Sequence, residues 1–256
     1  MSYNVRLFDL YNWSEGSKTR DSIISLLQTR DVDIFCFQEF YHTNRKGIFE
    51  TRDTLLQVLP TPYFQERYTH KMNGEQYFGV VTLSKYPIIQ KGEIPFESDD
   101  NNFCIYSDIE LGVDTFRVFN AHLASIRFQP EDYSELKTEL SISGVKRMAS
   151  KLQLAFEKRA NQAEKVAAEI SNSPHKVIVC GDFNDTPISY AYTTLSHDLT
   201  DSFVECGRGT GSTYVGDFPS FRIDYILHSP EMRAGQLKVL PQKFSDHHAI
   251  EAALWY

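Results

Sequence analysis

Two acids and an amide directly follow an apolar stretch near residue 180. Residues 177–180 form a short apolar run, and Gly181 separates them from Asp182, Asn184 and Asp185. Gly, Asp and Asn often end strands, because they tolerate unusual backbone angles and cap their own turns. Taken alone, the stretch indicates a strand and a turn. Carboxylates and an amide at one strand end are also groups that bind a metal ion or activate water.

The same arrangement recurs along the chain. Other apolar runs end in, contain or adjoin polar residues, namely Asn4, Gln38, Glu39, Asn120, His122, Asp224, Asp246 and His247. A single Asp or His at a strand end is usually a cap or a satisfied polar group. Strand ends on one edge of a sheet converge in space, however, and functional residues are commonly held there by a rigid scaffold. We therefore expect the strands to bring these side chains into one site.

The residue types indicate a class of chemistry. Four of them offer hard oxygen ligands: Glu39, Asp182, Asn184 and Asp246. Such a set, without sulfur, suits Mg²⁺, Mn²⁺ or Ca²⁺ better than zinc. His122 and His247 can donate to phosphate oxygens or stabilise a developing charge. Since a carboxylate beside a metal ion can orient and deprotonate water, the set predicts metal-assisted hydrolysis of a phosphoester.

Strands must position most of these residues. Apolar or alternating runs predict strands at 5–8, 32–37, 77–83, 88–94, 103–111, 115–122, 177–180, 222–227, 237–240 and 249–255. Asn4 is expected at the start of the first strand, and the second is expected to end at Gln38 and Glu39. We also expect a helix capped by Ser17, a helix over 51–59, and one or two long helices between 130 and 171. Many strands with a few helices between them predict one layered α/β domain over residues 1–256.

Composition narrows the class of protein. The chain has 256 residues, of which 41% are hydrophobic and 23% charged, as in soluble globular proteins. Its net charge of −8 argues against non-specific coating of nucleic acid, which needs a broad basic face. The four cysteines lack metal-ligand spacing, and Cys36 and Cys180 are expected to be buried thiols. The chain begins as if already inside a strand, so localisation stays open, and it could be a domain cut from a longer membrane-tethered or exported protein.

Several of these segments, in this order, resemble the endonuclease/exonuclease/phosphatase superfamily. The segments are SYNV around Asn4, FQE at 37–39, GVVTLSKYP at 79–87, NAHL at 120–123, GDFND at 181–185, RIDYIL at 222–227 and SDHHAI at 245–250. Each motif alone is weak, but the ordered set spans nearly the whole chain. The resemblance implies a four-layer sandwich, in which two mixed β-sheets pack face to face with helices outside.

The resemblance also implies roles for individual residues. Glu39 would be the principal metal ligand, with Mg²⁺ or Mn²⁺ as the cofactor, and Asp246 would support the metal region. Asp182 would orient and activate the water, with Asn4 and Asn184 holding it and the phosphate in place. His247 would contact the phosphate and be oriented by Asp224. His122 would be a second phosphate donor. Arg159, on the helix before the GDFND strand, would be either a structural residue or a substrate contact.

No specialised subfamily is matched well. Arg6 stands where some abasic-site enzymes carry an acid, and RIDY at 222–225 replaces the Cys-Asp-Arg motif of inositol 5-phosphatases. The segment 125–158 is interpreted as an insertion, which is either a solvated helix pair or a rim that selects the substrate.

We therefore predict a metal-dependent hydrolase of a phosphodiester in nucleic acid, a phospholipid headgroup or a small molecule. The alternatives are an inositol-phosphate or lipid phosphatase, or an idle binding module on the same fold. The phosphoester is the only expected partner, and the protein is expected to be a monomer.

Overall fold

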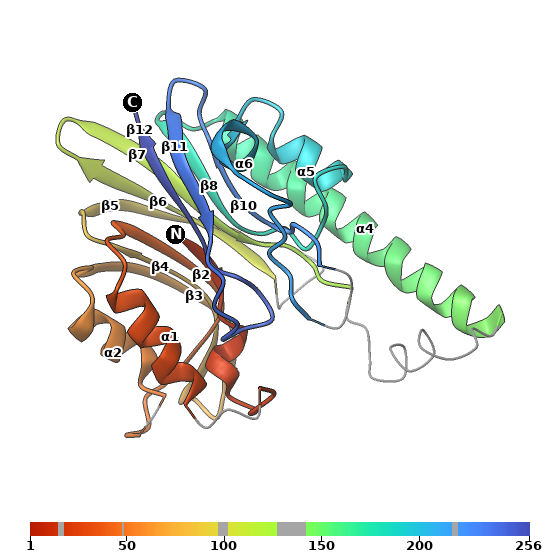
Figure 1. Cartoon of the computed structure of the whole chain (residues 1–256), viewed down its shortest axis with the longest axis horizontal. Helices are drawn as coiled ribbons and strands as arrows, with labels where there is room; N and C mark the ends of the chain where they lie inside the picture. The colour runs from red at the N-terminus through yellow and green to blue at the C-terminus, as the bar shows by residue number, and fades with distance from the viewer. Residues whose placement is uncertain (15–17, 48, 97–101, 127–141, 217–219) are drawn as a thin grey trace.

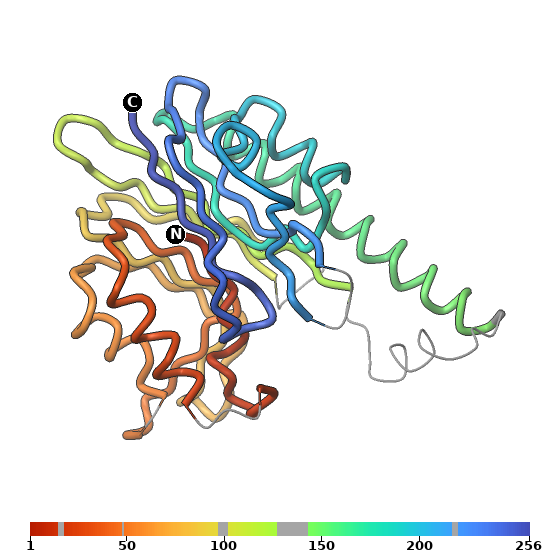
Figure 2. Tube along the Cα trace, viewed as in Figure 1, coloured from red at the N-terminus to blue at the C-terminus, as the bar shows by residue number. Residues whose placement is uncertain are grey.

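Two six-stranded mixed sheets form the centre of the computed structural model (Figures 1 and 2). It describes residues 1–14, 18–47, 49–96, 102–126, 142–216 and 220–256. The first sheet has the order β11 (Arg233–Val239), β12 (Ile250–Trp255), β1 (Ser2–Asn4), β2 (Ile34–Thr43), β4 (Gln76–Ser84) and β3 (Tyr63–Met72). The second has the order β5 (Ile88–Ile94), β6 (Phe103–Leu111), β7 (Asp114–His122), β8 (Lys176–Asp182), β10 (Asp224–His228) and β9 (Thr200–Asp201).

Helices cover the outer faces of both sheets (Figure 1). The helices are η1 (Arg6–Asp9), α1 (Thr19–Gln28), α2 (Thr51–Val58), α4 (Ile142–Ser171), α5 (Tyr190–Leu195) and α6 (Ser202–Cys206). Helices α1 and α2 lie over the first sheet, whereas α4 and α5 lie beside the second. No helix among the described residues has the length and apolar character needed to cross a membrane.

Alternation along the strands produces three apolar layers. Phe35 and Phe37 of β2 face α1 and α2, while Cys36, between them, faces the other sheet. In β8, Val179 packs with α4 and Cys180 packs between the sheets. The result is helices, sheet, sheet and helices, so the predicted four-layer sandwich is confirmed. The single domain over 1–256 stays a prediction.

A buried amide connects the two sheets beside the central apolar layer. Asn120 of β7 donates through Nδ2 to the backbone oxygens of Phe37 and Val81, at 3.3 and 3.0 Å. Its Oδ1 accepts from Nε2 of Gln38 at 2.7 Å. Asn120 and Gln38, predicted to lie with the polar strand-end residues, are both fully buried and join the sheets instead. The contact fixes β7 relative to β2 close to Glu39 and to the strand end that carries His122.

Several predicted boundaries are wrong. The first strand is Ser2–Asn4, not 5–8, and Asn4 lies at its end. There the Oδ1 of Asn4 accepts from the backbone N–H of Arg6 at 3.0 Å, and the chain turns. The second strand does not end at Gln38 and Glu39 but continues to Thr43, because a bulge between Phe37 and Phe40 absorbs the interruption.

Other elements were not predicted from the sequence, or lie partly outside the described residues. Strand β3 is half-exposed, at the edge of its sheet, and rich in charged residues, which masks its alternation and is typical of protected edges. One long helix, α4, occupies residues 142–171 of the interval 130–171. The predicted cap Ser17 and residues 130–141 of that interval lie outside the described residues.

Four consecutive residues after β1 have left-handed backbone angles. Arg6, Leu7, Phe8 and Asp9 have φ between 42° and 62°. This conformation costs a non-glycine residue roughly 1–2 kcal/mol. Phe8 is buried, and its ring meets Phe40 edge-on at 5.1 Å between centroids. Burial of Phe8 therefore offsets part of the strain and fixes the turn.

Asn120→Ala should reduce the free energy of unfolding by about 2 to 4 kcal/mol, because it removes the buried hydrogen bonds to the Phe37 and Val81 carbonyls and to Gln38. Chemical denaturation measures this value. The control is Asn172→Ala, at an exposed position after α4, where a change within about 0.5 kcal/mol is expected. Equal stability of the two variants would show that the Asn120 contacts do not hold the sheets together.

Candidate active site

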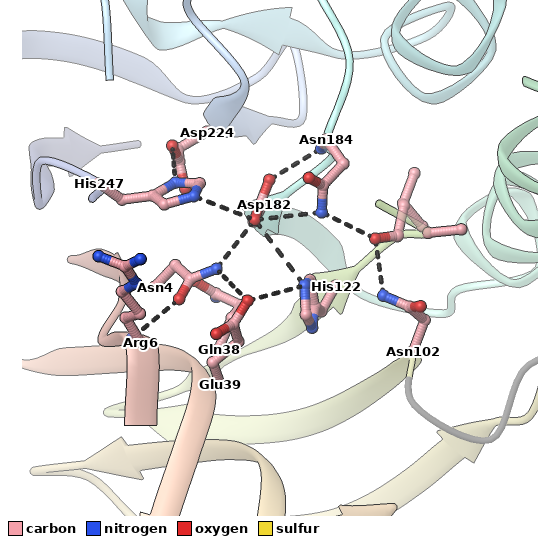
Figure 3. Close-up of polar contacts among 12 residues, drawn as sticks. Asn4, Arg6, Gln38, Glu39, Asn102, His122, Asp182, Asn184, Asp224 and His247 are labelled. Atoms are coloured by element: carbon pink, nitrogen blue, oxygen red, sulfur yellow. Dashed lines mark hydrogen bonds and ion pairs between the residues drawn. The ribbon is translucent and has the colours of Figure 1, made fainter. Parts of the chain in front are cut away.

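One buried carboxylate oxygen is the centre of the polar cluster (Figure 3). Oδ2 of Asp182 accepts from Nδ2 of Asn4 at 3.0 Å and from Nδ2 of Asn184 at 3.2 Å. The imidazole Nε2 atoms of His247 and His122 lie 3.7 and 3.8 Å from the same oxygen. Asp182 is only 1% exposed. Side chains from both sheets thus converge on one atom.

A glycine sets the approach of the two strands that carry Asp182 and His122. In the parallel register of β7 and β8, Gly181 pairs with Ala121, and Asp182 pairs with His122. A Cβ atom on Gly181 would lie 2.0 Å from the backbone oxygen of Ala121. Only glycine allows this approach, so Gly181 is part of the reason that His122 and Asp182 end side by side.

The bulge in β2 delivers the second acid. Glu39 has a left-handed φ of 48° and lies at the register shift in β2. Its Oε1 accepts from Nδ2 of Asn4 at 3.2 Å, and Nε2 of His122 lies 3.9 Å away. The same amide group of Asn4 therefore joins Glu39 to Asp182. The Glu39 side chain is 37% exposed, so it lies at the open side of the cluster.

Asp224 and His247 are in direct contact although 23 residues separate them. Nδ1 of His247 donates to Oδ2 of Asp224 at 2.9 Å. Burial would lower the pKa of His247, but the carboxylates of Asp224 and Asp182 outweigh it and raise that pKa well above its usual value. Oδ1 of Asp224 is buried and has no hydrogen-bond partner among the described residues, so the carboxylate depends on His247.

Burial also changes the acids. The pKa of Asp182 rises to about 6, because burial and the nearby Asp224 outweigh the stabilisation from His247, His122 and Asn4. Although the Glu39 side chain is 37% exposed, its pKa is raised by loss of hydration among the surrounding atoms and by the charge of Asp246, against the effects of His247 and Asn4. Both carboxylates therefore hold a proton more readily than exposed acids do. A cation beside them would favour their charged forms.

Asp246 lies at the edge of the cluster. Its Oδ2 is 3.2 Å from Nε of Arg6, and the two side chains are about one-quarter to one-third exposed. Arg6, which the sequence marked only as a departure from other enzymes, is thus part of the rim. An arginine after a short strand carries no signal of such a contact.

Arg159 lies away from this cluster. It is 1% exposed, and its guanidinium donates to Oδ2 of Asp185 and to the backbone oxygen of Ala124, both at 2.8 Å. Gln162 accepts from the backbone N–H of Ala124 at 2.8 Å. These contacts clamp the segment after His122 against the turn after Asp182. They favour the structural role of Arg159 over the predicted substrate contact.

Two supporting residues were missed. Thr213 accepts through Oγ1 from the backbone N–H groups of Ile223 and Asp224, which fixes the start of β10. Asn102 donates to the backbone oxygen of Leu123 at 2.7 Å, and Asn184 donates to the same oxygen at 2.9 Å. Thr213 lies in a loop with no apolar pattern around it, so the sequence gives no reason to select it. Asn102 directly precedes the apolar run 103–111, and this position is the signal that could have found it.

The donor set fits a hard divalent cation. Asp182, Asp224 and His247 place candidate ligand atoms within 4.8 Å of one another. However, Asp224 and His247 already satisfy each other through a hydrogen bond. The more open oxygens belong to Glu39, with Asp246 close enough to raise its pKa. Carboxylate and amide oxygens are the ligands that Mg²⁺ and Mn²⁺ prefer.

Comparison with known proteins gives one family. The model of the Endonuclease/Exonuclease/phosphatase family matches residues 1–247. A search of the curated proteins found no match.

Solved structures share the fold at low identity. A family protein from Leptotrichia buccalis C-1013-b is 18% identical, with a TM-score of 0.69 over 100% of this chain and 98% of that one. A mannosyl-6-phosphatase from Bacteroides thetaiotaomicron VPI-5482 gives the same four values. TDP2 from D. rerio, complexed with a single-strand DNA product, is 16% identical, with a TM-score of 0.70 over 100% and 97% of the two chains.

The contact between Asp224 and His247 predicts a measurable shift. In the metal-free protein, Asp224→Asn should lower the pKa of His247, because it removes the carboxylate that favours the imidazolium. NMR titration of the His247 ring protons measures it. Asp198→Asn, which removes an exposed acid, should leave the titration unchanged. A His247 pKa that is equal in both variants would contradict the proposed electrostatic pair.

Proposed function

The chain belongs to the endonuclease/exonuclease/phosphatase family, and on that basis we propose that it is a divalent-metal-dependent phosphoester hydrolase. One observation carries the proposal: two carboxylates, two amides and two imidazoles meet around Oδ2 of Asp182 and Oε1 of Glu39. Acids suited to a cation and to a water molecule thus lie beside donors suited to a phosphate group.

Asp182 is the proposed general base. Its carboxylate is held by the amides of Asn4 and Asn184 and by the backbone N–H of Asn184, which donates to Oδ1 at 2.8 Å. These hydrogen bonds fix the orientation of the carboxylate oxygen that would take a proton from water. A pKa of about 6 is closer to neutral pH than that of an exposed acid, which suits a base that works near pH 7.

The two histidines are the proposed phosphate contacts. Asp224 fixes Nδ1 of His247 and favours its protonated form, so that Nε2 carries a proton toward the centre of the cluster. Nε2 of His122 faces the same centre from β7, between Glu39 and Asp182. Two imidazoles facing the space beside the base would stabilise the charge that develops on phosphoryl oxygens.

Glu39 is the proposed principal ligand of the cation, with Asp246 supporting it. When bound, Mg²⁺ or Mn²⁺ neutralises negative charge on the phosphoryl oxygens. Asn4 holds the Glu39 oxygen in place next to the base. Because protons compete for a carboxylate with a raised pKa, affinity for the cation should fall as the pH falls.

The substrate is proposed to be a phosphodiester. Relatives of this fold include a mannosyl-6-phosphatase and a protein solved with a single-strand DNA product, so sugar phosphates and nucleic acids are both natural tests. The diester is favoured because RIDY at 222–225 lacks the motif of the inositol 5-phosphatases. A panel of single- and double-stranded DNA, RNA, sphingomyelin, inositol phosphates and a sugar phosphate, each with Mg²⁺ and with chelator, tests the class.

Glu39→Gln should lower kcat/KM by orders of magnitude and raise the Mg²⁺ concentration needed for half-maximal rate. The amide still accepts from Asn4 but lacks the charge that binds a cation. Steady-state rates over a Mg²⁺ titration measure both effects. The exposed Glu110→Gln is the matched control and should behave as the unchanged protein does. Full turnover in chelator would reject the metal-dependent mechanism.

Asp182→Asn should lower kcat by about 10²–10⁴-fold, because the group that takes the proton is removed. In the unchanged protein with Mg²⁺ bound, the cation favours the charged carboxylate, so the base is protonated only somewhat below a pH of about 6, and kcat/KM should fall about tenfold per pH unit in that range. The variant should lose this acid limb.

Thermal unfolding gives the control for Asp182→Asn. Since the raised pKa means that folding disfavours the charged carboxylate, stability of the metal-free protein is lost as pH rises from the ordinary range of Asp through about 6. The uncharged variant should therefore be at least as stable at pH 7. In the kinetic experiment, an Asp182→Asn variant that retains near-full kcat would show that another group accepts the proton.

A further inference from the structure

Two large aromatic side chains are exposed beside the candidate active site. The side chains of Tyr11 and Trp13 are 58% and 45% exposed, and their ring centroids lie 5.1 Å apart at an angle of 64°. Exposed aromatic clusters are unusual on a soluble protein unless they bind something. Neither residue takes part in the mechanism above.

Arg6 joins this aromatic pair to the site. Its guanidinium carbon lies 4.7 Å from the centroid of the Trp13 ring, and its Nε lies 3.2 Å from Oδ2 of Asp246. Its backbone N–H donates to Oδ1 of Asn4, the same side chain that holds Asp182 and Glu39. Figure 3 shows Arg6 on the Asn4 side of the cluster. A single side chain therefore separates the Trp13 ring from the edge of the site.

Hydrogen bonds hold the turn that carries the pair. Oδ1 of Asp9 accepts from the backbone N–H of Ser14 at 3.1 Å, and the Ser14 hydroxyl donates to Oδ2. The backbone N–H of Asn12 donates to the oxygen of Asp9 at 2.8 Å. Phe8 anchors the start of the loop in the core. The rings are thus presented to solvent by a braced turn, which lowers the entropy that a ligand must remove on binding.

We propose that Tyr11 and Trp13 bind a nucleobase of the substrate, next to the phosphate that is hydrolysed. This inference rests on the proposed function and adds the substrate class. Every nucleobase has a flat face that stacks on an exposed aromatic ring, and arginine beside such rings is typical of sites that bind single-stranded nucleic acid. A net charge of −8 argues against a broad basic face that would bind nucleic acid. We therefore expect aromatic stacking to hold the base.

Arg6 also argues against a cationic headgroup. A quaternary ammonium group such as choline binds in aromatic cages by cation–π attraction. On Trp13 a guanidinium already occupies that type of position, and it would repel a second cation. A neutral flat base next to an anionic phosphate fits the same surroundings.

Tryptophan fluorescence tests binding independently of hydrolysis. The chain has two tryptophans, Trp13 and Trp255, so Trp255→Phe leaves Trp13 as the only one. In that protein, with Asp182→Asn added to prevent hydrolysis, oligothymidylate should quench the fluorescence. A chain of the same length with tetrahydrofuran in place of each nucleoside sugar and base should not. A dinucleotide shows which length of substrate the pair binds. Quenching as strong as that by oligothymidylate would indicate a small diester, and weaker quenching would indicate a longer strand.

Kinetics test the consequence for the reaction. The ratio of KM for the base-free chain to KM for oligothymidylate should be about 5- to 150-fold in the unchanged protein, which is the range that stacking of one base provides. Trp13→Ala should bring the ratio close to one, Trp13→Phe should restore most of it, and Trp255→Phe is the matched control that should keep it.

The outcomes separate this inference from the proposed function. Equal quenching by both chains, or stronger quenching by phosphocholine or a sugar phosphate, would overturn the nucleobase assignment even if the protein hydrolyses phosphodiesters. Failure to hydrolyse any phosphoester would instead reject the proposed function, and the fluorescence titration would still decide whether Trp13 binds a base.

Discussion

The structure depends on keeping one carboxylate, Asp182, buried between two sheets. An acid that is 1% exposed is costly to ionise unless donors surround it. Asn4 comes from β1 of the first sheet, and Asn184 and His122 come from the second sheet and the turn after it. His247 comes from the segment before β12. These donors meet only when the two sheets pack against each other in the observed arrangement. The geometry of the site therefore depends on the packing of the fold.

Three local departures from regular structure position the residues of the site. The bulge in β2 brings Glu39 to the same amide that holds Asp182. Gly181 allows β7 and β8 to approach where His122 and Asp182 emerge. The left-handed turn after β1 directs Arg6 to Asp246 and presents Tyr11 and Trp13 to solvent. Strain at functional positions persists because the surrounding core fixes it, as Phe8 and Phe40 do here.

Sequence patterns predicted the layers better than these departures. Apolar strands ending in acids and histidines gave the location of the cluster, because alternation and strand ends follow from local chemistry. The bulge at Glu39 depends on pairing with β4, which is distant in sequence. The prediction of a strand over 5–8 was wrong because the Asn4 side chain accepts from the backbone of Arg6, and the chain turns there. Arg159 shows the same limit: an arginine near a catalytic motif gives no sign that Asp185 and Ala124 already hold it.

The central claim is that Glu39 and Asp182 form one centre for a cation and a water molecule, and Mn²⁺-soaked crystals test it most directly. Anomalous diffraction locates the ion without depending on any substrate. The account predicts a peak at coordination distance from the Glu39 carboxylate, on the side that faces Asp182 and His122. A peak bound only by Asp224 and His247, or no peak beside Glu39 at saturating Mn²⁺, would contradict it.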